Sequence, residues 1–331
     1  MEERRVLIVA YDGFQALDVT GPFEVFAGAG RLARRRGGAG YDVRLVSLDG
    51  GPRRSESGLV LLTEPLDAVL APAGKQRVDT LLIPGGDGVH KASRDAALLA
   101  AVGGLAGRAR RVVSVCSGAF VLAAAGLLDG KRATTHWARG RQLAERFPTV
   151  AVDTEPIWTR DGDVWTSAGV TAGIDVALAL VEDDHGTDVA VTCARWLVMF
   201  LRRPGGQSQF AGPVWRTPAR AEPVRRAQQL IDADPAGDHR VRVLATKVAM
   251  SERHFLRRFG DEVGTTPAQY VASARLDAAR RELEQTGDTV VAVARRVGFG
   301  SAESMRRAFV RHLGVAPDHY RQRFTTGRTT T

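Results

Sequence analysis

Two stretches of the sequence, SERHFLRRFGDEVGTTPAQY at 251–270 and SAESMRRAFVRHLGVAPDHY at 301–320, decide the fold of the C-terminal third of the chain. They align without a gap at an offset of 50 residues. The leading serine, an arginine, a phenylalanine, a glycine, a proline and the final tyrosine are identical in the two copies. Such a match indicates one supersecondary unit that the chain uses twice.

Each copy is predicted to form a helix, a tight turn and a second helix. The first helices are expected at 241–249 and 289–297, where apolar residues recur at helical spacing. Each second helix begins at a serine, which can cap the first turn, and ends at a glycine, the usual C-cap. These caps are Ser251 with Gly264, and Ser301 with Gly314. The order is that of a helix-turn-helix unit.

The second helices are predicted to have an inward apolar face and an outward polar face. Phe255, Phe259 and Val263 recur every four residues, as do their counterparts in the second copy. The N-terminal part of a recognition helix meets base edges, where arginine binds guanine and serine binds bases or phosphates. The alternative is an ordinary solvated charged face. The candidate DNA contacts are Ser251, Glu252, Arg253, Arg257, Arg258, Ser301, Glu303, Ser304, Arg306, Arg307 and Arg311.

Positive charge concentrates in the same region. The chain of 331 residues has a formal net charge of +9, and residues 221–331 contain 19 basic and 13 acidic side chains. This third of the chain therefore holds most of the excess, which favours a polyanionic partner. Because arginine greatly outnumbers lysine throughout, a compositional bias is the competing explanation.

Residues 224–324 resemble the DNA-binding domain of the AraC/XylS family of bacterial transcription regulators. The resemblance rests on segments 244–255 and 294–321. It implies that the two recognition helices, joined by a long helix at 267–284, enter successive major grooves on one face of the DNA. Glu252 replaces a proline that is frequent in the family, which affects the favoured base rather than the fold.

The first two hundred residues or so alternate between apolar strand patterns and helical patterns. Such alternation predicts a parallel sheet with helices on both faces. The expected strands are 5–11, 41–47, 59–63, 80–84 and 111–115, with a hairpin at 157–166. The expected helices are 21–36, 95–109, 118–128, 171–184 and 187–203. The predicted fold class is an α/β domain followed by an all-α domain.

A cysteine lies at a predicted junction of strand and helix. Cys116 directly follows the strand at 111–115, which is the order of a nucleophile elbow. The helix N-terminus is expected to lower the pKa of the thiol. The backbone N–H groups of Gly85, Gly86 and Ser117 are expected to form an anion pocket at the carboxyl ends of the strands.

Candidate polar partners for this thiol occur elsewhere in the N-terminal domain. Asp18 and Glu24 belong to the segment after the first strand, and His136 follows further along the chain. A cysteine, an acid and a histidine can form a catalytic set. The alternative is a small residue at the edge of the core with a structural histidine. The spacing alone leaves both readings open.

Residues 4–200 resemble the DJ-1/PfpI superfamily, whose class I glutamine-amidotransferase-like fold has flavodoxin-like layers. The segments that carry the resemblance are 18–26, 84–86, 115–119, 133–137 and 203–210. The two-domain order resembles GlxA-type regulators of the AraC family, which implies a sensor domain. The implied ligand pocket comprises Asp18, Glu24, Gly85, Gly86, Cys116, Ser117 and His136.

The residue after the cysteine separates branches of this superfamily. Proteases of the PfpI type are expected to have histidine there, whereas this chain has Ser117. Protease activity is therefore not expected. The isocyanide-hydratase branch is more similar, because it has an acid at the position of Asp18 and a hydroxyl residue after the cysteine.

We interpret the chain as a one-component transcription regulator. The expected organisation is a sensor and dimerisation domain at 1–203, a stiff proline-containing linker at 204–223, a DNA-binding domain at 224–324 and a flexible tail at 325–331. The expected partners are promoter DNA, an unidentified small-molecule effector and a second copy bound through the N-terminal domain. RNA polymerase is a further candidate partner. The alternatives are a thiol-dependent enzyme fused to a DNA-binding domain, either isocyanide-hydratase-like or amidase-like, and a structural scaffold.

Other features of the sequence narrow the chemistry. We expect no metal site and no cofactor, because histidines and cysteines lack metal-ligand spacing and no P-loop occurs. Cys193 is expected to be a buried structural residue of a helix. No apolar run has the roughly 18 residues of a membrane span, and no secretory signal is recognised. We therefore expect a cytoplasmic, nucleoid-associated protein without a membrane partner.

Overall fold

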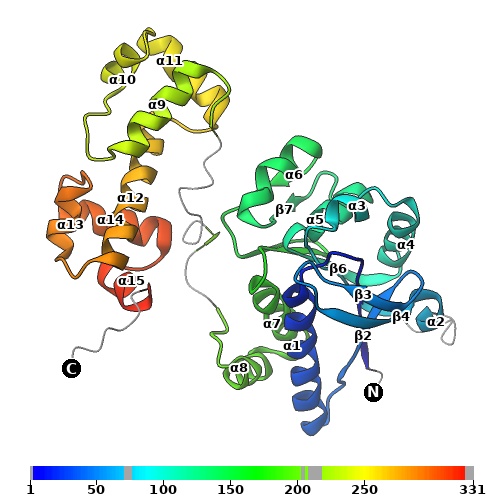
Figure 1. The fold of residues 1–331 in the computed structure, drawn as a ribbon. Helices are drawn as coiled ribbons and strands as arrows, with labels where there is room; N and C mark the ends of the chain where they lie inside the picture. The colour runs from blue at the N-terminus through cyan, green and yellow to red at the C-terminus, as the bar shows by residue number, and fades with distance from the viewer. Residues whose placement is uncertain (1–2, 71–76, 203–205, 208–217, 325–331) are drawn as a thin grey trace. The chain divides into compact units, whose positions relative to one another are not determined.

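The computed structural model describes residues 3–70, 77–202, 206–207 and 218–324. The chain divides into two compact units, Met1–Arg203 and Pro204–Thr331 (Figure 1). Most of the predicted linker and the whole predicted tail lie outside the described residues. Pro223 is an exception, because it lies in the first turn of a helix rather than in the linker.

The N-terminal unit is built on an eight-stranded sheet with the strand order β3-β4-β2-β1-β5-β6-β10-β9. Within the described residues, the central strands pair in parallel, and the two edge strands, β3 and β9, are antiparallel to their neighbours. The strands are β1 (Arg4–Val9), β2 (Tyr41–Ser47), β3 (Gly51–Arg54), β4 (Val60–Pro65), β5 (Val78–Ile83), β6 (Ala109–Val115), β9 (Trp158–Asp161) and β10 (Val164–Ser167). A separate pair consists of β7 (Arg132–Ala133) and β8 (Ala151–Val152). The predicted parallel sheet is therefore confirmed. The predicted hairpin forms β9 and β10 at one edge of this sheet.

Helices cover both faces of this sheet. One group packs together as α1 (Ala16–Arg35), α7 (Ala172–His185) and α8 (Thr187–Trp196). The other group comprises α3 (Val89–Ala92), α4 (Ala96–Ala106) and α5 (Ala119–Ala124). Figure 1 shows α1 and α7 side by side across the sheet. Two further helices, α2 (Leu66–Leu70) and α6 (Gly140–Arg146), lie outside these groups.

Two predicted helix boundaries are wrong by five residues or more. The first helix begins at Ala16 rather than residue 21, because the Gln15 side chain accepts a hydrogen bond from Leu17 N and caps it there. The helix continues through Pro22, whose lack of an N–H makes it look like a helix start. The last helix ends at Trp196 rather than residue 203, because Val198 adopts a left-handed backbone conformation with φ 57°.

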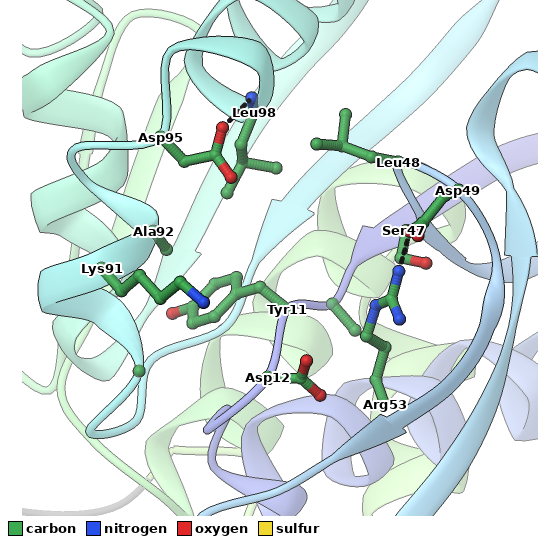
Figure 2. A pocket seen from close by; sticks show the side chains of 12 residues that line it. Tyr11, Asp12, Ser47, Leu48, Asp49, Arg53, Lys91, Ala92, Asp95 and Leu98 are labelled. Atoms are coloured by element: carbon green, nitrogen blue, oxygen red, sulfur yellow. Dashed lines mark hydrogen bonds and ion pairs between the residues drawn. The ribbon is translucent and has the colours of Figure 1, made fainter.

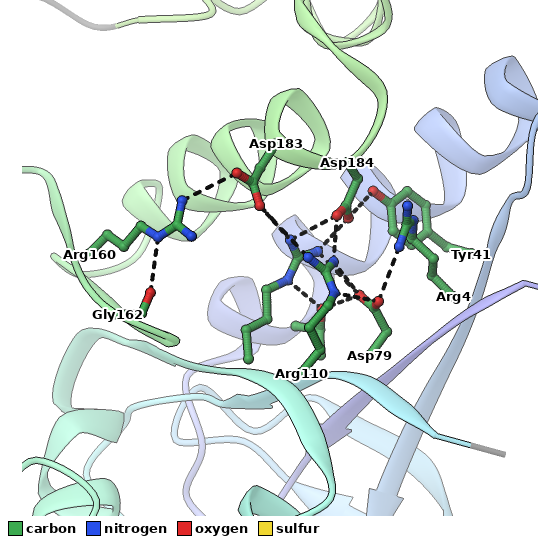
Figure 3. Close-up of polar contacts among 10 residues, drawn as sticks. Arg4, Tyr41, Asp79, Arg110, Arg160, Gly162, Asp183 and Asp184 are labelled. Atoms are coloured by element: carbon green, nitrogen blue, oxygen red, sulfur yellow. Dashed lines mark hydrogen bonds and ion pairs between the residues drawn. The ribbon is translucent and has the colours of Figure 1, made fainter. Parts of the chain in front are cut away.

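An ion-pair cluster fastens α7 to the amino ends of the strands (Figure 3). The buried Asp184 accepts hydrogen bonds from Arg111 at 2.5 Å and from the Tyr41 hydroxyl at 2.7 Å. Arg110 bonds both Asp184 and Asp79. This cluster lies at the amino-terminal ends of the strands. Cys116 follows the carboxyl end of β6, so the two lie at opposite ends of the strands.

The described residues of the C-terminal unit form helices joined by short connections and contain no strand, as predicted. Its helices are α9 (Glu222–Ala233), α10 (Val241–Lys247), α11 (Glu252–Val263), α12 (Pro267–Gln285), α13 (Val290–Arg296), α14 (Ala302–Leu313) and α15 (Pro317–Phe324). Two small cores result, one around Phe255 and Phe259 and one around Met305 and Phe309. The long helix α12 contributes to both cores and connects the two copies of the repeat.

Candidate functional site

The caps of the two repeated helices form as the sequence predicts. Ser251 Oγ accepts from His254 N at 3.4 Å, and Ser301 Oγ accepts from Ser304 N at 3.1 Å. Both C-cap glycines are left-handed, with φ 75° at Gly264 and φ 67° at Gly314. Each second helix is therefore bounded by specific chemistry at both ends.

The two helices separate apolar from polar side chains. Phe255 and Phe259 are fully buried in one copy, and Met305, Phe309 and Leu313 are fully buried in the other. The opposite face is open to solvent. Its exposed candidates are Ser251, Glu252, Arg253, Arg257, Arg258, Ser301, Glu303, Arg306, Arg307 and Arg311, whereas Ser304 is half-buried.

The charged groups on these faces differ in how they are held. In α14, Arg306 donates to Glu303 at 2.7 Å, and Arg307 lies 3.9 Å from the same carboxylate. The hydrogen bond from Arg306 lowers the pKa of Glu303. In α11, Arg258 pairs with Glu262, whereas Arg257 has no ion pair within the described residues. Arg257 is consequently free to meet a base or a phosphate.

Two apolar residues on these faces were missed by the sequence analysis. Leu256 is 43% exposed on α11, and Val310 is 45% exposed on α14. An exposed aliphatic side chain on a recognition helix can contact the methyl group of thymine. The sequence does indicate both residues, because each is apolar and lies outside the four-residue spacing of the core face.

The second candidate site surrounds Cys116. Strand β6 ends at Val115, and Cys116 opens a short 3-10 turn, η1 (Cys116–Gly118), that leads into α5. Cys116 has φ 57°, a conformation that non-glycine residues rarely adopt. Its carbonyl accepts from Thr135 Oγ1 at 2.7 Å, and its N–H donates to Ala168 O at 3.1 Å. The strand-to-helix elbow predicted from sequence is confirmed.

Glycines let the surrounding segments approach the elbow. A Cβ added to Gly85 would lie 2.6 Å from Ser117 N. A Cβ on Gly169 would lie 2.9 Å from Cys116 Sγ and 2.3 Å from Cδ2 of His136. The thiol and the imidazole therefore both contact Gly169, and a larger residue there would displace one of them.

Asp18 is the central acid of the site. Its side chain is fully buried, and it accepts from Gly85 N at 2.9 Å and from Val170 N at 3.1 Å. Burial raises the pKa of Asp18 to about 7, and the two backbone donors oppose this shift. Val170 has φ 55°, which is unusual for a β-branched residue. The acid thus binds a second strained segment beside the strained cysteine.

The predicted activation of the thiol is wrong. Burial, followed by the nearby Asp18 carboxylate, raises the pKa of the half-buried Cys116 to about 12. Hydrogen bonds from Ser117 oppose the shift without reversing it. The loss of solvation and the adjacent negative charge therefore determine the direction of the shift. Cys116 is therefore a thiol rather than a thiolate near neutral pH while Asp18 is ionised.

The predicted anion pocket does not form from the glycine loop. Gly85 N–H donates to Asp18, and Gly86 N–H donates to Ser117 Oγ at 3.0 Å. Ser117 is itself buried and directed toward Gly86 and the thiol. These groups stabilise the elbow internally, so they do not point at an incoming oxyanion.

His136 lies near the thiol, whereas Glu24 does not. His136 Nδ1 accepts from Ala138 N at 3.2 Å, which places its proton on Nε2. Burial, with a smaller effect of Arg139, lowers the pKa of His136, so it is neutral at pH 7. Glu24 is exposed and lines a separate groove with Asp42. The structure therefore brings together every predicted pocket residue except Glu24.

The structure adds acidic and polar groups that the sequence analysis missed. Glu56 accepts from Gln15 Nε2 at 2.6 Å and from Asp87 N at 2.7 Å, and its charge contributes to the raised pKa of both Asp18 and Cys116. No local pattern marks Glu56, because it reaches the site from the turn after β3. Among the described residues, no group of histidine, cysteine or acidic side chains is arranged to hold a metal ion.

Comparison with known proteins identifies the class. Residues 4–183 match the model of the DJ-1/PfpI family, and residues 244–323 match a helix-turn-helix domain. The chain belongs to the DJ-1/PfpI family and carries a helix-turn-helix domain of the AraC type. It is a transcription regulator with a DNA-binding domain, as the sequence analysis predicted.

Individual relatives support both halves. The HTH-type transcriptional regulator Rv1931c of Mycobacterium tuberculosis is 38% identical over 75% of this chain and 96% of its own length. Isonitrile hydratase of Pseudomonas putida is 39% identical over 53% of this chain and 70% of its own length. A solved structure, a THiJ/PfpI family protein from Pseudomonas syringae, matches 70% of this chain and 88% of its own with a TM-score of 0.54 and 28% identity. No helix in the described part of the chain is long and apolar enough to cross a membrane.

Proposed function

We propose that the N-terminal unit binds a small molecule beside Cys116, and that binding alters the affinity of the helix-turn-helix unit for promoter DNA. The observation that carries the proposal is the contact of Asp18 with two segments at once. Its carboxylate accepts from Gly85 and Val170, next to two left-handed non-glycine residues. Strain of this kind persists at sites where a local change is coupled to function.

A ligand can shift DNA affinity only if it binds two conformations of the protein with different affinity. The elbow offers such a difference, because the buried Asp18 carboxyl interacts with the Cys116 thiol and also holds the segment at Val170. A ligand that donates a hydrogen bond to Asp18, or that accepts one from the thiol, favours one arrangement. The segment around Val170 leads directly into α7, so a shift there reaches the rest of the unit.

The second copy and the cellular setting belong to the same proposal. The regulator acts as a homodimer through residues 1–203, contacts promoter DNA at the nucleoid in the cytoplasm, and has RNA polymerase as a further partner. Sedimentation of the full chain at micromolar concentration tests the dimer. A monomer at that concentration contradicts this part of the proposal.

The central test uses a covalent probe in place of the unknown ligand. Genome-wide mapping first supplies a bound DNA site, and affinity for that site is then measured before and after alkylation of the full chain with iodoacetamide. We expect a change of roughly fivefold or more, the usual lower range of allosteric coupling. Cys116→Ser is the matched control and should not respond. Equal affinity before and after complete alkylation of Cys116 contradicts the proposal.

A thiol-dependent hydratase is the second candidate function, favoured by the acid beside the thiol and by the isonitrile hydratase relative. Its weakness is the raised pKa of Cys116, which leaves little thiolate. The full chain should be incubated with an alkyl isocyanide and examined for the formamide product. Formation that disappears in Cys116→Ser establishes the activity, whereas no product leaves the sensor function alone.

A further inference from the structure

A separate cavity of about 440 Å³ opens at the carboxyl ends of β1 and β2 (Figure 2). It does not contain Cys116, Asp18 or His136. Its lining comes from the segments after the two strands, from β3, and from α3 and α4. The lining includes acidic, basic and apolar side chains, among them Asp12, Arg53, Lys91 and Leu98. This volume falls in the range of small-molecule sites.

The acidic groups of the lining are already engaged. Asp95 Oδ1 caps α4 by accepting from the backbone N–H groups of Ala97 and Leu98. Asp12 Oδ1 accepts from Arg54 N at 3.0 Å. Asp49 forms an ion pair with Arg53, so the charge of that arginine is compensated.

Lys91 differs from the other charged side chains of the lining. Its ammonium group forms no hydrogen bond or ion pair with any residue that the structure describes. In Figure 2 its side chain extends from α3 toward the middle of the lining. Apolar walls lie close by, because Ala10, Ala92 and Leu98 are almost fully buried and line the same cavity. Lys91 is exposed, and it is the cation of this lining that has no ion pair in the described part of the chain, whereas Asp12 and Asp95 keep their charge on backbone donors. A cation beside apolar walls matches an anion with an aliphatic body.

We propose that this cavity binds a small aliphatic monocarboxylate, with the carboxylate on Nζ of Lys91 and the hydrocarbon part against Leu48 and Leu98. The site goes beyond the proposed function, because it lies outside the thiol site and names its ligand class. Only an effect of the bound carboxylate on DNA affinity rests on the proposed function.

The cavity and the thiol site share backbone. Tyr11 lines the cavity and donates from its hydroxyl to Pro84 O at 2.6 Å. Gly88 lines it too and donates to Gly13 O at 3.0 Å. The loop from Pro84 to Gly88 therefore lies between the two sites, so a bound carboxylate contacts the loop that supplies Gly85 to Asp18.

Binding is tested by calorimetric titration of the full chain with straight-chain carboxylates from acetate to octanoate. Hexan-1-ol and hexylamine serve as neutral and cationic probes of matched length. We expect at least one carboxylate to bind, and the alcohol and the amine to bind more weakly. No binding by any carboxylate overturns the proposal, and so does tighter binding of hexylamine, which would assign the cavity to a cation.

Variants locate the site. Lys91→Met keeps the length of the side chain and should weaken carboxylate binding at least tenfold, because a charge-assisted hydrogen bond is lost. Arg94→Met, a neighbouring exposed residue outside the lining, should leave affinity unchanged. Equal affinity in Lys91→Met and the unmodified chain, at unchanged melting temperature, refutes the assignment.

Discussion

At the scale of single residues, the buried carboxyl of Asp18 is the group whose protonation the fold controls most clearly. It is held by two backbone donors, yet burial raises its pKa to about 7. The folded chain thus binds this proton more tightly than the unfolded chain. Protonation of Asp18 also removes the negative charge that raises the pKa of Cys116.

Asp18→Asn should remove a pH dependence of stability. Because the folded pKa lies above the ordinary value, Asp18 contributes stability fully below about pH 4, and the contribution is lost as pH rises through about 7. The free energy of unfolding of the unmodified chain should fall over this window, by up to roughly 4 kcal/mol at the linkage limit. Urea unfolding from pH 4 to pH 8 measures the difference between the two proteins, and parallel pH profiles would rule out the assignment.

Arg257→Ala and Arg307→Ala should each weaken binding to a mapped DNA site by about 1–3 kcal/mol if the side chains contact bases. Both are exposed on the faces opposite the cores. Arg226→Ala on α9 removes the same charge from an exposed position outside the two helices. Binding curves at one fixed salt concentration compare the three variants. A loss in Arg226→Ala equal to the other two would indicate general electrostatics only.

Single residues were predictable where chemistry followed local order, and unpredictable where tertiary contacts decided. Cys116 was found because an apolar strand ran directly into a helix pattern. Glu24 was misplaced because residues six apart on a helix lie roughly 120° apart around its axis, so it cannot share the direction of Asp18. The thiol pKa was misjudged because burial and the Asp18 charge arise only after folding.

At the scale of elements, the repeated helices owe their boundaries to caps. Gly264 is left-handed with open space around it, whereas Gly260 lies inside α11 and also has open space. Both glycines therefore have room for a Cβ, and they differ in backbone conformation. Opposite effects of the same substitution are expected.

Gly264→Ala should destabilise the helical unit by about 1 kcal/mol, because alanine resists positive φ. Gly260→Ala should stabilise it by roughly 0.5–1 kcal/mol, because alanine favours a helix interior. Calorimetric unfolding of the full chain, followed through the transition of the helical unit, measures both. Effects of the same sign would contradict the C-cap assignment.

Elements with strong periodicity, and the hairpin marked by its turn, were predictable, whereas several other short elements were not. The paired repeat predicted α10, α11, α13 and α14 with small shifts at their ends. Strand β3, helix α3 and the β7–β8 pair escaped prediction, because they are two to four residues long and depend on neighbours for their hydrogen bonds.

At the scale of the whole molecule, the chain consists of two compact units with separate hydrophobic cores. The N-terminal unit has one large core, and the helical unit has two small ones joined by α12. We expect the ion-pair cluster of Figure 3 to stabilise the first unit rather than to bind a ligand, because it lies at the ends of the strands away from the thiol site. Function is therefore expected to tolerate changes in it that leave the unit folded.

Asp184→Asn should destabilise the N-terminal unit by about 3–5 kcal/mol, because Arg111 would remain buried without a full counter-charge. Asp183→Asn is the control: its side chain is 33% exposed, so we expect less than about 1 kcal/mol. Thermal unfolding of both variants provides the comparison. Equal losses would show that the cluster does not depend on the buried pair.

The assignment of two recognition helices is tested most directly by a base-substitution scan of one mapped DNA site, carried out with the unmodified chain and with Arg257→Ala and Arg307→Ala. If α11 and α14 are two recognition helices, each variant should lose base discrimination in a different major groove, with the two positions about 10 base pairs apart on one face of the DNA. Loss at the same base pairs in both variants, or unchanged discrimination in either, would contradict the reading of the repeated helices as two recognition helices.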